Sequence, residues 1–262
     1  MVEAADHSSN HIIQVRRLVN QFGKHVVHQG LELDVRKGEI LGVVGGSGTG
    51  KSVLLRSIVG LRRPTSGQVR VFGENILELS DERRSQIERR FGVLFQAGAL
   101  FSSLTVIENI CLPLIEHKNL SRPQAEQIAA MKLALVGLPS NAATKYPSEL
   151  SGGMVKRAAL ARAMALDPDI LFLDEPTAGL DPISAAAFDN LLLTLRNALG
   201  FTVFLVTHDL DTLYTICDRV GVLAEKRMLV CDTLENVAQH PNDWIQAYFN
   251  GPRGRAAQHT AT

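Results

Sequence analysis

The sequence lacks the features of a membrane-embedded or nucleic-acid-binding chain. It has no run of about 18 apolar residues, the length that a membrane-spanning helix needs, so we expect no segment to cross a bilayer. It also has no excess of either charge, because Lys plus Arg and Asp plus Glu both number 27 among its 262 residues. Binding to a phosphate backbone normally requires a basic excess. We therefore expect no nucleic-acid partner.

Cysteine is scarce, and the start of the chain has no secretory character. The three cysteines, Cys111, Cys217 and Cys231, lack the spacing of metal ligands. An odd, scattered set is typical of a reducing cytoplasm, and we expect these side chains to serve packing. Residues 1–10 are polar and lack the apolar core of a signal peptide. We expect them to be disordered.

What the sequence does contain is a glycine-rich octet, Gly-Gly-Ser-Gly-Thr-Gly-Lys-Ser, at residues 45–52. It fits the phosphate-binding pattern G-x-x-x-x-G-K-[ST]. The glycines let successive backbone N–H groups turn toward phosphate oxygens. Lys51 supplies charge for the β- and γ-phosphates, and the Ser52 hydroxyl is a ligand for Mg²⁺. The residues expected at the nucleotide are Gly45, Gly46, Ser47, Gly48, Thr49, Gly50, Lys51, Ser52 and Val53.

The flanking residues favour this interpretation over a plain flexible turn. The apolar run 40–44 predicts a buried strand before the octet. After it, Leu54, Leu55, Ile58 and Leu61 recur at helical spacing. The order strand, glycine loop, helix also brings the partial positive charge of a helix N-terminus to the phosphates.

Strands alternate with helices along most of the chain, which predicts an α/β fold with a mostly parallel sheet. A charged helix is expected over 80–90, and 104–166 is mainly helical. A helix is expected to start at Asp181-Pro182 and to end at Gly200. A further helix is expected to start at Asp209. The expected strands are 91–95, 170–173, 202–206 and 220–223.

Two acids follow the apolar strand 170–173. The C-terminal ends of parallel strands are where ligands bind, so Asp174 is a candidate for holding Mg²⁺ and Glu175 for polarising the attacking water. The simpler alternative is an acid that caps the next helix. The presence of the phosphate-binding loop in the same chain favours the catalytic interpretation.

Residues 150–154, Leu-Ser-Gly-Gly-Met, form a second glycine-rich motif. Gly152 and Gly153 precede the expected helix 155–165, whose start is a second potential anion site. With these motifs in order, residues 12–240 resemble the ATP-binding subunit of ABC transporters. The resemblance implies a P-loop NTPase fold over 11–240, with an inserted helical subdomain at about 100–166 and a C-terminal extension at 241–262.

The resemblance also assigns roles to single residues. Gln96 matches the Q-loop glutamine on Mg²⁺, His208 matches the switch histidine on the γ-phosphate, and Phe22 matches the aromatic that stacks on adenine. Asp181 belongs to the D-loop, and Ser151, Gly152, Gly153 and Met154 form the signature, which usually ends in Gln. Without the resemblance, the simpler alternatives are that Gln96 is a surface residue, that His208 has a structural role and that Phe22 belongs to the core.

The family works as a homodimer in which each site joins one subunit's phosphate loop to the other's signature helix. The resemblance therefore implies two ATP molecules with Mg²⁺ per dimer, and an integral membrane permease that the dimer drives. A non-transport ABC ATPase remains an alternative, although such proteins usually carry a coiled-coil insertion or tandem ATPase units, which this sequence lacks.

Two stretches, 95–106 and 147–154, look like the Mla-type phospholipid transport ATPase. That likeness implies a place on the cytoplasmic face of the bacterial inner membrane, with a permease, a small STAS-like subunit and a periplasmic lipid-binding MCE-type ring. An importer of small polar solutes is the alternative within transport. In the tail, Trp244 and Tyr248 share one helical face, either packing on their own domain or docking on a second subunit or the STAS-like partner.

Overall fold

Short connections decide the strand pairing at the start of this computed structural model, which describes residues 10–251, 254 and 257. Strands β1 (His11–Phe22) and β2 (His25–Arg36) are joined by two residues, and so short a loop permits only antiparallel pairing. Gly23 occupies the left-handed region there, with φ 57°. Strands β4 (Ser66–Val71) and β5 (Glu74–Asn75) extend this antiparallel sheet in the order β2-β1-β4-β5.

The chain forms two compact units, Met1–Ile87 with His208–Thr262, and Glu88–Thr207. In the first unit, β3 (Ile40–Val44) pairs in parallel with β9 (Arg219–Ala224), and β10 (Arg227–Asp232) pairs antiparallel with β9. All five residues of β3 are buried, as expected of a parallel strand covered on both faces. The helices that begin in this unit are α1 (Lys51–Ile58), α2 (Asp81–Glu88), α7 (Leu210–Ile216), α8 (Leu234–Ala238) and α9 (Asp243–Phe249).

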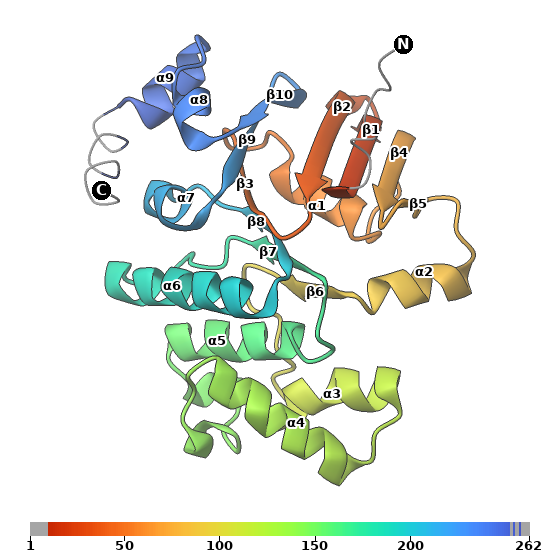
Figure 1. Cartoon of the computed structure of the whole chain (residues 1–262), viewed down its shortest axis with the longest axis vertical. Helices are drawn as coiled ribbons and strands as arrows, with labels where there is room; N and C mark the ends of the chain where they lie inside the picture. The colour runs from red at the N-terminus through yellow and green to blue at the C-terminus, as the bar shows by residue number, and fades with distance from the viewer. Residues whose placement is uncertain (1–9, 252–253, 255–256, 258–262) are drawn as a thin grey trace, which may run out of the picture. The chain divides into compact units, whose positions relative to one another are not determined.

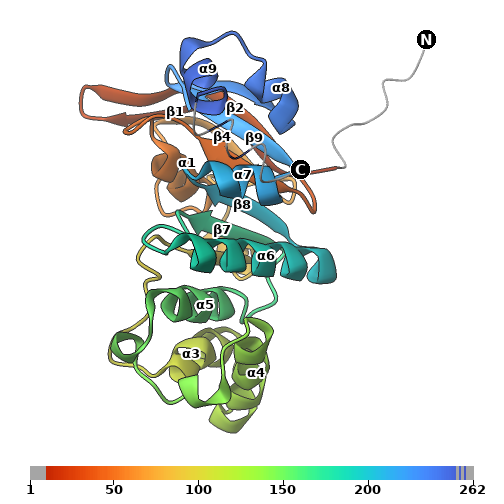
Figure 2. The ribbon, with the colours of Figure 1, turned by 90° about the vertical axis from the view of Figure 1, so that its left-hand side faces the viewer.

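The second unit has its own parallel strands, β6 (Phe91–Leu94), β7 (Ile170–Asp174) and β8 (Thr202–Val206), in that order. Figure 2 shows α6 running beside β7 and β8, and α3, α4 and α5 grouped together. Short 3₁₀ turns, η2 (Ser140–Ala142) and η3 (Pro147–Glu149), lead into α5. The helices are α3 (Val106–Lys118), α4 (Arg122–Leu135), α5 (Gly152–Ala163) and α6 (Pro182–Leu199).

The predicted α/β class with mostly parallel core strands is confirmed (Figure 1). The helix boundaries read from capping residues are confirmed most closely. Asp181 caps α6 by accepting from the backbone N–H of Ser184, and Gly200 ends α6 with φ 74°. None of the helices in the described part of the chain has the length and apolar character needed to span a bilayer.

Two predictions at helix ends were wrong. We expected Gly152 and Gly153 to precede α5, but the helix begins at Gly152 because the Ser151 side chain caps it. Glycine is tolerated in a first turn when a cap fixes the helix start. We also expected Leu61 to continue the apolar face of α1. That helix ends at Ile58, and Leu61 is 65% exposed.

Candidate functional site

The glycine-rich loop lies between β3 and α1 in the first unit, as the sequence predicts. Gly48 and Gly50 have φ of 76° and 98°, a region that side chains disfavour. A Cβ on Gly50 would lie 2.4 Å from a methyl carbon of Val27 and 2.5 Å from Nε2 of His28. Glycine is therefore required at residue 50 both by backbone conformation and by space.

The loop and the start of α1 together present positive potential. Lys51 Nζ donates to the carbonyl oxygens of Gly45, at 2.8 Å, and Gly46, at 3.1 Å. The N-cap of α1 is Gly50, which has no side chain to accept from the first N–H groups, and the first turn contains no acidic residue. An ammonium beside a helix N-terminus that lacks a side-chain cap suits phosphate oxygens.

The Ser52 hydroxyl fits Mg²⁺, which prefers oxygen ligands. Within the described residues, no group of three or more His, Cys, Asp or Glu side chains is placed to hold a metal. Mg²⁺ usually binds through one or two protein ligands, substrate phosphates and water. Ser52, the second residue of α1, supplies a hydroxyl at the loop.

A buried polar network supports the loop from below. Asn20 Nδ2 donates to Nδ1 of His28 and to the hydroxyl of Ser57, each at 3.0 Å, and all three residues are fully buried. This leaves the ring proton of His28 on Nε2, which lies against Gly50 without a hydrogen bond of normal geometry. Burial lowers the pKa of His28 to about 4, although the backbone of Gly50 and Thr49 opposes the shift.

Phe22, at the end of β1, is 46% exposed rather than core. The guanidinium of Arg62 lies over its ring, 3.6 Å from the centroid, and Arg62 also donates to the carbonyl of Gln21 at 3.0 Å. This cation–π contact takes one face of the ring. An adenine that stacks on Phe22 must use the other face or displace the arginine.

His208 stands in the loop before α7, where it is exposed. Its carbonyl oxygen accepts a hydrogen bond from the phenol of Tyr248, at 2.8 Å. The first unit therefore contains Phe22, the phosphate-binding loop and His208.

The second unit contains the acids. Asp174 is the last residue of β7 and is buried, whereas Glu175 is partly exposed just beyond the strand. Glu175 has φ 51°, which is rare for a residue with a side chain. Such strained backbone is concentrated at functional sites, where the surrounding structure enforces it.

Lys156 connects two of the predicted catalytic segments. It lies buried in α5, and its Nζ donates to the carbonyl of Gln96 at 2.5 Å and to that of Glu175 at 3.4 Å. Burial lowers the pKa of Lys156, and the Glu175 carboxylate opposes the shift. The structure thus brings Gln96, Asp174 and Glu175 to one place in the second unit.

The signature residues are organised by two helix caps. Ser151 accepts from the N–H of Met154 at 3.4 Å and starts α5. The Asp181 carboxylate accepts from the N–H and the hydroxyl of Ser184, and these bonds lower the pKa of Asp181. A cavity of about 260 Å³ adjoins both helix starts and is lined by Met154, Ser184 and neighbouring residues.

Comparison with known proteins decides the family. Residues 28–178 match the model of the ABC transporter family. The chain belongs to the ATP-binding subunits of ABC transporters. It is accordingly an ATPase that uses ATP with Mg²⁺, as expected from its motifs.

Several relatives match this ABC ATPase over nearly its whole length. It is 38% identical to the intermembrane phospholipid transport system ATP-binding protein MlaF of Haemophilus influenzae, over 93% of this chain and 92% of that protein. It is 37% identical to MlaF of Escherichia coli K12, over 94% and 91%. It is also 38% identical to the probable ribonucleotide transport ATP-binding protein mkl of Mycobacterium leprae, over 92% of this chain and 69% of that protein.

Solved structures of ABC cassettes share the fold. A dimeric cassette, MJ0796, in a post-hydrolysis state with ADP and phosphate, is 30% identical with a TM-score of 0.77, covering 85% of this chain and 98% of that one. The structure of cbiO1 from Clostridium perfringens, part of the transporter complex cbiONQ, is 26% identical with a TM-score of 0.79, covering 97% and 100%.

Four residues of this ABC ATPase that contact its candidate site residues were missed by sequence reasoning. His28, Arg62, Lys156 and Tyr248 each lie against a predicted site residue from a distant part of the chain. None belongs to a short motif, so only the folded chain shows the contacts. Tyr248 alone had a local signal, its helical pairing with Trp244.

Substitution of Lys51 by Ala is expected to weaken ATP binding roughly 10- to 100-fold, because one charge-assisted contact to phosphate contributes about 1.5–3 kcal/mol. Isothermal titration with ATP and Mg²⁺ measures this directly. The control is Lys37→Ala, which removes an exposed lysine between β2 and β3. Unchanged affinity in Lys51→Ala would contradict the assignment of the loop.

The buried His28 predicts that the protein loses stability in mild acid. Its pKa is about 4 in the folded chain and 6.5 in the unfolded chain, so the unfolded chain binds more protons between these values. Stability therefore falls as pH drops through this window, by about 2 kcal/mol from this residue at pH 5. Urea unfolding at pH 7.5 and pH 5 measures the loss.

His28→Gln should remove most of that difference between the two pH values. His25→Gln, at an exposed position on the same strand, should keep the wild-type dependence. If His28→Gln loses as much stability between the two pH values as wild type, His28 is not the group responsible.

Proposed function

We propose that this ATPase powers the transport of phospholipids between the inner and outer membranes. The observation that supports this is the matched length of the two MlaF relatives, which the chain covers at 91–92% with 37–38% identity. The mkl relatives have the same sequence identity, 38%, but the chain covers only 67–69% of their length.

Within each subunit, we assign the reaction to the residues that match the family's motifs. Ser52 and Gln96, with Asp174 acting through water, would hold Mg²⁺, and the ion would offset charge on the phosphates. Phe22 stacks on adenine. Glu175 accepts the proton of the attacking water, and His208 donates to the γ-phosphate oxygens. The strained backbone at Glu175 and the Lys156 bridge to Gln96 support this assignment.

A homodimer completes the proposed site. Ser151, Gly152, Gly153 and Met154, with Asp181, face the ATP of the partner subunit, where the N-terminus of α5 meets its phosphates. The dimeric MJ0796 cassettes support this arrangement. ATP binding would then close the dimer, and hydrolysis would reopen it.

The proposed assembly places the dimer on the cytoplasmic face of the inner membrane. Its partners are an integral permease, a small STAS-like subunit and, through the permease, a periplasmic MCE-type ring. The MlaF relatives, which belong to an intermembrane phospholipid transport system, support this assembly as a whole.

Ribonucleotide transport is the second candidate, because the mkl relatives are also 38% identical. A pull-down of the tagged chain from mild-detergent membranes separates the two. Phospholipid bound to a complex with a permease and a STAS-like protein supports lipid transport. A permease without lipid, which binds a ribonucleotide, would replace that proposal while leaving the ATPase chemistry intact.

Glu175→Gln should bind ATP normally yet lose at least about 100-fold in turnover, the typical contribution of a general base. With ATP and Mg²⁺ it should elute as a dimer in size-exclusion chromatography. Glu225→Gln, in the exposed β9–β10 turn, is the matched control and should turn over ATP like wild type. Wild-type turnover in Glu175→Gln would remove Glu175 as the base.

A further inference from the structure

The C-terminal helix α9 is anchored firmly in the first unit. Ile245 and Phe249 are fully buried in a cluster that includes Val44, the residue immediately before the phosphate-binding loop. The Asn242 side chain caps the helix by accepting from the N–H groups of Trp244 and Ile245. The helix therefore packs on its own unit. Of the two alternatives for the tail, packing on its own domain is the one that the structure shows for these residues.

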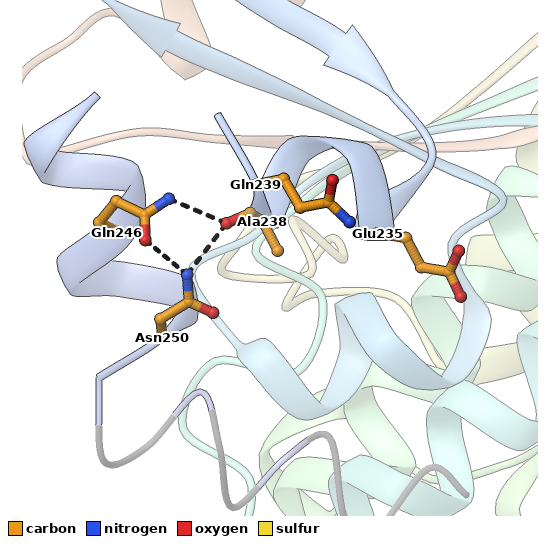
Figure 3. A pocket seen from close by; sticks show the side chains of 5 residues that line it. All are labelled: Glu235, Ala238, Gln239, Gln246 and Asn250. Carbon is orange, nitrogen blue, oxygen red and sulfur yellow. Dashed lines mark hydrogen bonds between the residues drawn. The ribbon is translucent and has the colours of Figure 1, made fainter. Parts of the chain in front are cut away.

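An adjacent side of α9 is tied to α8. Figure 3 shows Gln246 and Asn250 directed at the end of α8, where both donate to the carbonyl of Ala238 at 3.0 Å. Gln246 also donates to the carbonyl of His240 at 2.8 Å. These bonds hold α9 against α8.

Trp244 and Tyr248 form a stacked pair on a different face of α9. Their ring centroids are 4.7 Å apart with an interplanar angle of 14°, and Tyr248 meets the buried Phe249 edge to face. Both rings also pack against the cluster around Val44. A stack with this much support loses little further freedom when it makes a polar contact.

This aromatic pair contacts one part of the candidate site and lies close to another. The Tyr248 phenol donates to the His208 carbonyl at 2.8 Å. At the other end of the pair, a methyl group placed on Gly46 would lie 3.7 Å from the indole nitrogen of Trp244. One rigid element of the tail is thus in reach of the loop for the phosphates and of the loop that carries the switch histidine.

We propose that Tyr248 is a positioning residue, whose hydroxyl holds the backbone of His208 so that the imidazole is presented to the γ-phosphate. The proposal rests on the role of His208 proposed above. A backbone carbonyl fixed at 2.8 Å restrains the residue that bears the side chain, which reduces the rearrangement required in the transition state. Other groups bind the substrate, so loss of the Tyr248 hydroxyl should lower kcat and leave KM for ATP nearly unchanged.

Tyr248→Phe tests this with the least disturbance, because it removes one oxygen and keeps the ring stack. In the full-length chain, kcat should fall about three- to tenfold, the effect of one lost hydrogen bond. KM for ATP should stay within about twofold. Gln246→Ala is the matched control, because it loosens α9 from α8 without touching His208, and its kcat should match wild type.

The single tryptophan of the chain reports whether the stack survives. Without nucleotide, Trp244 emission should be the same in Tyr248→Phe and wild type. A changed emission, or a kcat loss that follows the fall in melting temperature equally in Tyr248→Phe and Gln246→Ala, would show a merely structural role and overturn the proposal.

His208→Ala separates the two proposals. If His208→Ala is inactive while Tyr248→Phe keeps wild-type kcat, the inference about Tyr248 is wrong and the role of His208 stands. If His208→Ala itself turns over ATP like wild type, the proposed role of His208 is wrong, and the inference about Tyr248 is overturned with it.

Discussion

The need to receive several phosphate charges on backbone N–H groups is the constraint on which the first unit depends. A loop that turns its N–H groups inward requires glycine where φ is positive, as at Gly48 and Gly50. It also requires a rigid base, which the fully buried β3 strand and the Asn20–His28–Ser57 network provide. The neutral state that burial enforces on His28 keeps a second positive charge from lying under the loop.

In the second unit, the backbone groups held in place near the candidate site are carbonyl groups rather than N–H groups. Lys156 draws together the backbone oxygens that follow β6 and β7, at Gln96 and Glu175. Burying an ammonium costs less when its protons are accepted, and these two carbonyls accept two of the three protons of Lys156. The hydrogen bond from Lys156 therefore restrains the backbone of Glu175, the proposed general base, in a conformation whose φ of 51° is unfavourable.

Sequence patterns predicted those parts of the protein that depend on neighbours along the chain. The strand–loop–helix at the octet, the α6 boundaries set by Asp181 and Gly200, and the parallel strands follow from local chemistry. The expected start of α5 after Gly153 was wrong, because the cap at Ser151 starts the helix at Gly152. The antiparallel sheet depends on the two-residue turn between β1 and β2 and on the pairing of β1 with the distant β4.

Sequence patterns could not predict the contacts that join distant segments of the chain. Helix α9 is the clearest case. Sequence spacing placed Trp244 and Tyr248 on one face, but two partners for that face were open. The decisive facts are the burial of Ile245 and Phe249 against Val44 and the bond to the His208 carbonyl, which lies 40 residues earlier. An aromatic face already engaged with its own unit has less apolar surface to offer a partner. The Tyr248 phenol instead binds the backbone of His208, and a tail outside every motif thereby becomes part of the catalytic framework that we propose.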